Sequence, residues 1–275
     1  MSSATAPVVD TASLKIIWMS DPHFTANGDV LGHDPKIRLD AAINHINAHH
    51  SDADLCVVSG DMVNRGTQTD YGSLSRHLSA LRPPMLPMVG NHDDRALLRE
   101  TLPLPGSCMS RFVQYSVSKP GAVIACLDTQ KTGSDAGEFC DERAAWLENI
   151  LENAGDTPVY LFLHHPPHAL GLPMQDTENM ENGDAFLDLI SQYECVKYLF
   201  FGHVHRPISG TVRGLPFSTM RSILYQAPAP RPAWNWDTFK PSEEPPSIGV
   251  ITISDASVTL QYEQFCHYQD GVSVA

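Results

Sequence analysis

The sequence predicts an α/β fold, and two observations carry this prediction. Short apolar runs, typical of buried strands, alternate along the chain with longer stretches in which apolar residues recur at helical spacing. Five times, such a run ends in a small or polar turn that carries Asp, Asn or His. Ligands in α/β folds gather beyond the carboxyl ends of the strands, so this repeated placement also predicts one shared site.

The first half of the chain predicts three strands and three helices. Leu39, Ile43 and Ile46 recur at helical spacing and would form one buried helix face. Pro83 and Pro84 would stop the second helix, because proline cannot continue the helical hydrogen bonding. The expected strands are residues 14–19, 55–58 and 85–89. The expected helices are residues 37–50, residues 70–81 and a short helix that runs through Leu98.

The second half predicts more strands than helices. The turn residues Pro120 and Gly121 separate two strand-like runs and indicate a hairpin. Leu147, Leu151 and Ala154 form an apolar stripe along one expected helix. The expected strands are residues 112–117, 122–127, 158–163, 196–201, 208–212, 248–253 and 258–262. The expected helices are residues 142–154 and 183–192.

Residues 228–246 differ in composition from the rest. They hold six prolines and two tryptophans, Trp234 and Trp236, and show almost no periodicity. Long irregular segments in compact domains are often functional, so we expect a lid over the site or an oligomer contact, with a plain loop as the alternative. We therefore divide the chain into a catalytic domain at residues 1–220 and a C-terminal cap or oligomerisation segment with closing strands at residues 221–275.

Charge and length bound the partners. A formal net charge of −14 disfavours binding to long nucleic acids, which need a basic surface. A small phosphorylated substrate is still compatible with this charge. Metal cations bound at its site, such as a pair of divalent ions, would make the local electrostatic potential positive. The 275 residues suffice for one large domain, or for one domain with a small appendage. We expect a homo-oligomer.

Three features predict a cytoplasmic protein. Residues 1–15 lack the basic region and apolar stretch of a secretory signal. No apolar run reaches the roughly 18 residues of a membrane span. The six cysteines are scattered without a CxxC pair, and Cys56 and Cys126 fall inside strand-like runs, so free thiols are expected.

The five polar turns carry the chemistry. In order, they are Asp21-Pro22-His23, Gly60-Asp61, Gly90-Asn91-His92-Asp93, His164 and Gly202-His203-Val204-His205. Each alone has an ordinary explanation, such as a turn, a helix cap or a packed loop. Five in succession, each after a strand, are not independent accidents. Oxygen and imidazole ligands on loops held by strands are what a two-metal hydrolase needs. The sequence therefore predicts a binuclear metal-dependent phosphoesterase, in particular a phosphodiesterase.

The residue types suggest individual roles. Asp61 is the best candidate for a bridging ligand, because a carboxylate offsets the repulsion between two cations about 3.5–4 Å apart. Asp21 and His23 lie two residues apart and can reach one ion. His203 and His205 have the same spacing and can be divided between two ions.

Two further residues complete the ligand set, and other histidines stay outside it. Asn91 offers a neutral carbonyl ligand, and His164 offers another imidazole. His165 is expected to contact substrate. His45, His49 and His50 are not expected to be ligands, because they lie on or at the end of a helix, where a protonated imidazole suits the dipole.

Over roughly residues 14–220, these motifs resemble those of the calcineurin-like metallophosphoesterases. The stretches SGDMVNRG, GNHDD and HHPP resemble in particular the bacterial class III cyclic nucleotide phosphodiesterases and glycerophosphodiesterases. The resemblance implies two packed mixed sheets flanked by helices, a four-layer α-β-β-α sandwich, and pairs of iron, manganese, zinc or cobalt ions. Pro22 departs from the usual Thr or Leu, and the match weakens after Gly214, so no cap can be carried over.

The resemblance also implies a ligand set and a mechanism. One metal would be held by Asp21, His23, Asp61 and His205, and the other by Asp61, Asn91, His164 and His203. His92 would face the substrate phosphate, with Asp93 to orient it. Asn91 and His92 would stabilise the charge on the phosphoryl oxygens, so Asn91, His92 and Asp93 are the candidate catalytic residues. A metal-bridging hydroxide would attack phosphorus in line with the leaving oxygen.

Three functions remain in competition at this point. The first is hydrolysis of small phosphodiesters, either cyclic nucleotides or glycerophosphodiesters. The second is a phosphomonoesterase or a nuclease on the same scaffold, and the acidic charge counts against the nuclease. The third is a non-catalytic scaffold protein, which the complete ligand set disfavours.

Overall fold

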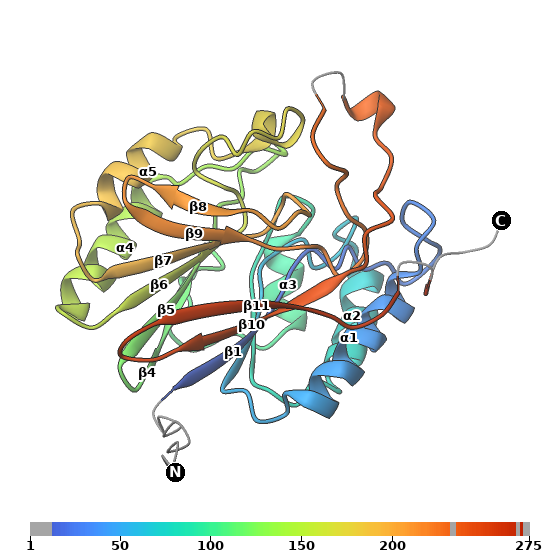
Figure 1. The fold of residues 1–275 in the computed structure, drawn as a ribbon, viewed down its shortest axis with the longest axis horizontal. Helices are drawn as coiled ribbons and strands as arrows, with labels where there is room; N and C mark the ends of the chain where they lie inside the picture. The colour runs from blue at the N-terminus through green and yellow to red at the C-terminus, as the bar shows by residue number, and fades with distance from the viewer. Residues whose placement is uncertain (1–12, 232–234, 268–269, 272–275) are drawn as a thin grey trace, which may run out of the picture.

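The computed structural model describes residues 13–231, 235–267 and 270–271. Two mixed sheets pack face to face, and helices cover both outer faces (Figure 1), which confirms the predicted fold class. The first 12 residues, on which the signal-sequence argument mostly rests, and Trp234 lie outside the described residues. No described helix combines the length and apolarity that crossing a lipid bilayer requires.

The first sheet joins both ends of the chain. Its strands, in spatial order, are β11 (Val258–Gln264), β10 (Ser247–Ile253), β1 (Leu14–Met19), β2 (Leu55–Val58) and β3 (Met85–Pro87). The strands β1, β2 and β3 run parallel, whereas β10 pairs antiparallel with β1 and β11 antiparallel with β10. The proposed boundary at residue 220 therefore divides one sheet, because β10, which follows the boundary, pairs with β1, which precedes it.

The second sheet carries the middle of the chain. Its strands, in spatial order, are β4 (Tyr115–Lys119), β5 (Ala122–Leu127), β6 (Val159–Leu163), β7 (Val196–Phe201), β9 (Leu215–Thr219) and β8 (Ser209–Val212). The helices among the described residues are α1 (Pro35–His49), α2 (Gln68–Leu78), α3 (Arg95–Thr101), α4 (Asp141–Ala154) and α5 (Gly183–Ile190), with short 3-10 turns η1 (Gln175–Glu178) and η2 (Trp236–Thr238). In Figure 1, α4 and α5 flank the second sheet, and α1 and α2 lie beside the first.

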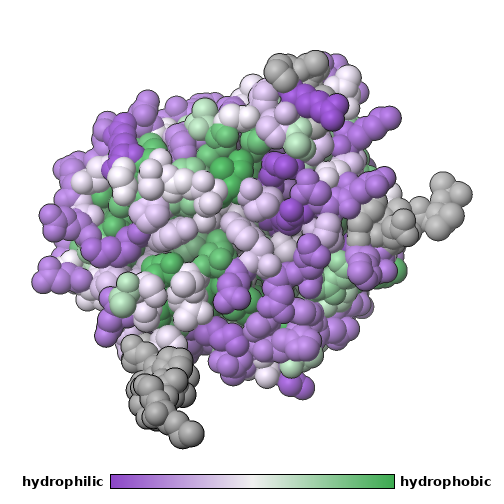
Figure 2. All heavy atoms as spheres, in the orientation of Figure 1, coloured by the Kyte–Doolittle hydropathy of each residue, from purple (hydrophilic) through white to green (hydrophobic). Residues whose placement is uncertain are grey.

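Alternation of side chains along β6 explains the two cores. Phe162 points into the core between the sheets, while Leu161 and Leu163 pack in the second core, with the side chains of α4 and α5. Trp18 of β1 meets Phe162 and Phe200 edge to face, at ring-centroid distances of 6.0 and 5.3 Å. These aromatic contacts fix one sheet against the other. Figure 2 shows that polar side chains cover most of the outer surface seen in that view, with apolar ones mainly over the sheets.

Several predicted boundaries shift, each for a local reason. The helix predicted at residues 70–81 spans 68–78, because the Thr67 hydroxyl accepts from the backbone N–H of Asp70, 3.2 Å away, and caps the helix early. The strand predicted at residues 112–117 begins at Tyr115, because the backbone N–H of Val113 donates to the Asp128 carboxylate instead of a neighbouring strand.

One strand of the second sheet was not predicted from the sequence. Strand β9 pairs antiparallel with β8 and parallel with β7, so it sits inside the second sheet. Its proline and short apolar run gave no clear period. The six cysteines are all free thiols in the structure.

Residues 228–231 and 235–246 belong to a segment that leaves the body of the molecule between β9 and β10 (Figure 1, orange). They include the short turn η2, and the backbone N–H of Ser242 donates to the carbonyl of Gln226 at 2.9 Å, which closes the base of the segment. The segment is therefore anchored where it meets the sheets.

The loops after β2, β3 and β6 approach so closely that two positions require glycine. A Cβ on Gly60 would lie 2.5 Å from Nδ1 of His164 and 2.9 Å from the backbone nitrogen of Gly90. A Cβ on Gly90 would lie 2.6 Å from Nε2 of His164 and 2.6 Å from the backbone nitrogen of Asp61. The glycines of the Gly-Asp and Gly-Asn-His-Asp motifs thus let distant loops meet.

We expect Gly90→Ala to lower the free energy of unfolding by about 1–3 kcal/mol, because the added methyl group overpacks a rigid loop junction. The matched control is Gly72→Ala, within α2, where a Cβ would meet no atom within 4 Å. That control should stabilise the protein by roughly 0.5–1 kcal/mol. Urea unfolding with excess chelator compares the variants without metal binding; equal midpoints for Gly90→Ala and wild type would contradict the packing argument.

Candidate metal centre

Most of the predicted ligands have a strained backbone conformation. Seven non-glycine residues in the described chain have positive φ, and five of them are predicted ligands: Asp21 (52°), His23 (41°), Asp61 (48°), His203 (69°) and His205 (49°). Such conformations cost about 1–3 kcal/mol each and persist only where the surroundings enforce them, typically at functional sites. The strain therefore marks this set independently of any motif.

The first group of ligands is a buried cluster of two carboxylates and two imidazoles. One ligand atom from each of Asp21, His23, Asp61 and His205 lies within 4.8 Å of the others. Nε2 of His23 is 3.5 Å from Oδ2 of Asp61 and 3.0 Å from Nε2 of His205. Nε2 of His205 is 3.4 Å from Oδ1 of Asp21. A single cation suits these converging donors.

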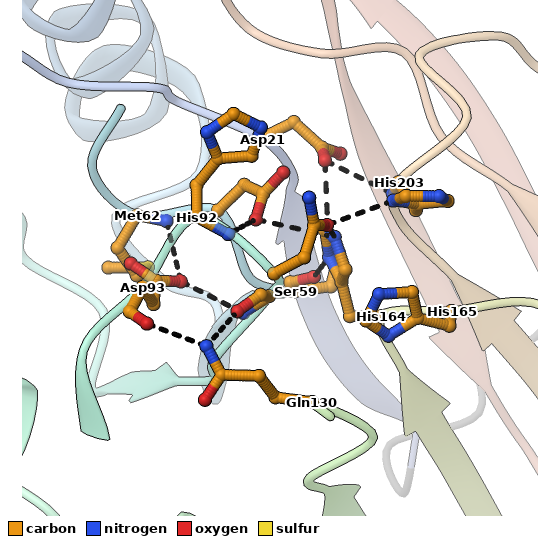
Figure 3. Close-up of polar contacts among 12 residues, drawn as sticks. Asp21, Ser59, Met62, His92, Asp93, Gln130, His164, His165 and His203 are labelled. Atoms are coloured by element: carbon orange, nitrogen blue, oxygen red, sulfur yellow. Dashed lines mark hydrogen bonds and ion pairs between the residues drawn. The ribbon is translucent and has the colours of Figure 1, made fainter. Parts of the chain in front are cut away.

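The second group shares Asp61 with the first. Oδ1 of Asn91 is 3.2 Å from Nε2 of His164 and 3.1 Å from Nδ1 of His203. Nε2 of His164 is also 3.4 Å from Oδ1 of Asp61. One oxygen of Asp61 thus faces each group, as a bridging carboxylate would. Figure 3 shows the side chains of Asp21, His164 and His203 gathered around one space.

Backbone carbonyls fix which imidazole nitrogen is free to bind metal. Nδ1 of His205 lies 3.0 Å from the carbonyl oxygen of Tyr225, and Nδ1 of His164 lies 2.8 Å from that of Ser59. A carbonyl only accepts, so each Nδ1 carries a hydrogen, and Nε2, which faces the cluster, is the nitrogen through which the neutral ring would bind a metal. The sequence carries no local signal for these contacts.

A buried chain of hydrogen bonds between hydroxyl groups leads from the core to the Asp21 carboxylate. Ser20 donates to the Asp21 carboxylate, and the hydroxyls of Ser20 and Ser59 are 2.8 Å apart. Nε1 of Trp18 donates to the Ser59 hydroxyl at 2.8 Å. The core between the sheets thereby orients the ligand. Sequence reasoning missed this chain, although each serine directly precedes a motif, at Asp21 and at Gly60.

The electrostatics of the site fit a cation. Burial lowers the pKa of His23 and of His203 to about 3, so both imidazoles are neutral and able to bind metal. Burial also lowers the pKa of His164, but the carboxylates of Asp61 and Asp21 outweigh it and raise the value to about 9. Without a metal, His164 therefore carries the positive charge that these buried carboxylates require.

Asp93 has a different contact from the one expected. Its carboxylate accepts from the backbone N–H of Gly90 at 2.9 Å and from the Tyr71 hydroxyl at 2.8 Å. The orienting contact to His92 comes instead from the carbonyl oxygen of Asn64, 3.0 Å from Nδ1 of the ring. The expectation that Asp93 orients His92 is wrong on this geometry, because adjacent side chains on the loop point to different neighbours. Asp93 anchors the loop.

Burial raises the pKa of the Asp93 carboxyl, and the negative charge of Asp61 raises it further, to about 7.

The same loop has a second anchor that sequence reasoning missed. The side-chain amide of Gln130 donates to the carbonyls of Gly90 and Asp93, at 2.9 and 2.6 Å. Figure 3 shows both anchors away from His203. The loop that carries Asn91 and His92 is thus held in place by the hydrogen bonds of Asp93 and Gln130.

His165 has no exposed surface, which argues against the expected contact with substrate. Its ring nitrogens lie 2.8 Å from the Thr129 hydroxyl and 3.1 Å from the carbonyl oxygen of Asp135. Its ring packs against that of His203 at a centroid distance of 4.7 Å. His165 therefore supports the ligand His203 from behind.

A cleft of about 440 Å³ opens onto the ligands. Besides ligands and His92, its walls comprise Leu31, Asp135, Glu178, Tyr225, Trp236 and Phe239. Leu31 and Trp236 are about half exposed, at 52% and 49%. Trp236 and Phe239 come from the segment at residues 228–246, so this segment reaches over the site, which fits a lid. The oligomer contact stays a prediction.

Comparison with known proteins agrees with this site. A probable cyclic nucleotide phosphodiesterase of Rhodopseudomonas palustris is 35% identical over 258 residues, which covers 92% of this chain and 93% of the relative. A glycerophosphodiester phosphodiesterase of Enterobacter lignolyticus is 32% identical over 216 residues, covering 76% and 77%. The 3′,5′-cyclic adenosine monophosphate phosphodiesterase of Escherichia coli K12 is 26% identical over 209 residues, covering 75% of each chain.

Among solved structures, a dimetal phosphatase from Danio rerio shares the fold, with a TM-score of 0.68 at 13% identity, over 92% of this chain and 97% of that one. The model of the calcineurin-like phosphoesterase family matches residues 14–207, which span every predicted ligand. The chain belongs to the calcineurin-like phosphoesterase family.

Proposed function

We propose that this protein is a binuclear metal-dependent phosphodiesterase that hydrolyses small phosphodiesters. The position of Asp61 carries the proposal, because its two oxygens face two separate sets of ligands, 3.5 Å from His23 and 3.4 Å from His164. Relatives named as cyclic nucleotide and glycerophosphodiester phosphodiesterases support the choice of diesters. Residues 1–220 would supply the ligands, and residues 221–275 the cap and closing strands.

The ligand atoms suit iron, manganese, zinc or cobalt. One ion would be held by Asp21, His23, Asp61 and His205, and the other by Asp61, Asn91, His164 and His203. When bound, such a pair lowers the pKa of water and offsets charge on the phosphoryl oxygens. The protein contributes fixed ligand directions and a cleft in which the diester is oriented.

His92 is placed to give a proton to the leaving oxygen. It lines the cleft, and its Nδ1 donates to the carbonyl of Asn64, which leaves Nε2 for the substrate. Burial lowers the pKa of His92, but the Asp61 carboxylate and the Asn64 carbonyl outweigh it, and the pKa is raised overall. More of the protonated ring therefore persists at neutral pH, as a general acid requires.

The cleft walls favour a substrate with a planar group. Tyr225 and Phe239 have ring centroids 6.3 Å apart, and those of Phe239 and Trp236 are 5.6 Å apart, so the three rings form a continuous wall. Bases stack on such faces. The carboxylates of Asp135 and Glu178 line the same cleft and disfavour a long polyanion. We therefore propose cyclic nucleotides ahead of glycerophosphodiesters, and small diesters ahead of nucleic acids.

A substrate panel on metal-loaded protein tests this function. We expect bis-p-nitrophenyl phosphate to be hydrolysed faster than p-nitrophenyl phosphate, and 3′,5′-cAMP faster than glycerophosphocholine. A chelator should abolish turnover, and Mn²⁺ should restore it, because the ligands act only with bound cations. Turnover that resists the chelator, or a preference for the monoester, would overturn the proposal.

His92→Ala should lower kcat for 3′,5′-cAMP by about 10²–10⁴-fold while the metal content stays at the wild-type value, because general acid catalysis is lost. The loss should be much smaller for bis-p-nitrophenyl phosphate, whose leaving group departs without a proton. His77→Ala is the matched control, since this partly exposed histidine pairs with Asp40 outside the cleft. Loss of metal from His92→Ala would make His92 a ligand or a structural residue instead.

Trp236→Ala should lower kcat/KM for 3′,5′-cAMP roughly 5- to 150-fold, the equivalent of about 1–3 kcal/mol of base stacking. Hydrolysis of glycerophosphocholine, which has no ring to stack, serves as the internal control and should change less than about twofold. Trp236→Phe keeps an aromatic face and should retain most activity. Equal losses on both substrates would show that Trp236 does not select the base.

A further inference from the structure

A second group of potential ligands lies outside the cleft, where helix α1 meets strand β11. His45 belongs to α1, His50 follows its last turn, and Glu263 lies on β11, the edge strand of the first sheet. None of the three lines the cleft or belongs to the candidate metal centre. The helix-end role expected for these histidines does not explain a carboxylate placed between two of them.

The carboxylate of Glu263 is divided between the two imidazoles. Its Oε1 is 2.7 Å from Nε2 of His45, and its Oε2 is 3.0 Å from Nε2 of His50. One ligand atom from each of the three residues lies within 4.8 Å of the others. The side chains of His45 and His50 are mostly buried, with 18% and 12% of their surface exposed. The cluster is thus held by packing and is not a chance meeting of free side chains.

Ordinary surface pairs in this protein look different. His77 faces Asp40 with one imidazole and one carboxylate, 2.6 Å apart. In the α1–β11 cluster, two imidazole nitrogens converge on one carboxylate from different positions of the chain. Hydrogen bonds from both rings outweigh burial and lower the pKa of Glu263, so the carboxylate stays charged.

We propose that His45, His50 and Glu263 form a third metal site, separate from the catalytic centre, that takes one Zn²⁺ or a similar borderline cation. Two imidazoles and a carboxylate are the ligands that such ions prefer. Zinc–ligand bonds of about 2.0–2.2 Å place tetrahedral ligands roughly 3.3–3.5 Å apart. The two contacts to Glu263 need to widen only slightly to admit the ion.

The site would tie the edge strand to a helix. Strand β11 pairs on one side only, with β10, and most of its residues are exposed or half exposed. A cation shared by α1 and β11 would fix this edge, because it links two elements that meet through side chains alone. His49, whose ring centroid is 4.7 Å from that of His45, is the nearest further imidazole.

Zinc counting by equilibrium dialysis tests the site. Full-length protein saturated with zinc at the catalytic centre is dialysed against micromolar Zn²⁺, and bound zinc per chain is measured by atomic emission. Wild type should hold one equivalent more than the double variant His45→Ala/His50→Ala. The control His77→Ala should match wild type, because its pair lacks a second imidazole. Diester hydrolysis within about twofold of wild type would show that the double variant is folded.

An equal zinc count in all three proteins overturns the proposal. Should the double variant fail to fold, Glu263→Gln decides, because it keeps the shape of the side chain and removes its charge. We expect Glu263→Gln to weaken binding of the additional zinc at least tenfold; unchanged binding overturns the site. The readout is zinc per chain and not turnover, so failure here is distinguishable from failure of the proposed function.

Discussion

The structure is organised around one buried carboxylate that faces two sets of imidazoles. Asp61 follows β2 and has one oxygen near His23 and the other near His164. Both sets of candidate ligands share it, and although burial raises its pKa, His164, His92 and His23 outweigh burial and hold the pKa well below its usual range, so it stays ionised. This mutual dependence explains why the five loops must meet at one place. It also explains why glycine stands where Gly60 and Gly90 face His164 at close range.

The strained backbone of the candidate ligands depends on a rigid framework of two packed sheets. Five ligands with positive φ cost of order 1–3 kcal/mol each. Together they approach the whole net stability of a typical domain. The two sheets can enforce such strain because Trp18 packs against Phe162 and Phe200 and also donates to Ser59. The same residue thus belongs to the core and to the support of the ligands. A cation that binds only the folded state would return part of the cost.

Patterns along the chain predict the framework well, because strands and helices have their own periods. The candidate ligands can also be selected from the sequence, since each follows an apolar run and has a chemically suited side chain, and the structure brings them together. Contacts across loops are not predictable in this way. The carbonyls of Ser59, Asn64 and Tyr225 orient three histidines, but every residue has a carbonyl, so no residue type marks them. Adjacency misleads for Asp93, which follows His92 in sequence but contacts Tyr71.

The segment at residues 228–246, which we propose as a lid, shows why the substrate is harder to predict from sequence patterns than the candidate metal centre. Glu244 lies where this segment leads back to β10, and it pairs with Arg221 at 2.7 Å and with Arg206 at 3.2 Å. Arg206 directly follows the ligand His205, and it also donates to the carbonyl of Ala227 at 3.0 Å. Ion pairs therefore join the base of this segment to the loop that carries the proposed ligand His205, whereas the tip carries Trp236 with half its surface exposed. Under the proposed function, a different tip on this base would change the diester that is recognised, because hydrogen bonds that position the proposed ligands, such as those of His164 and Asp21, come from the body of the molecule.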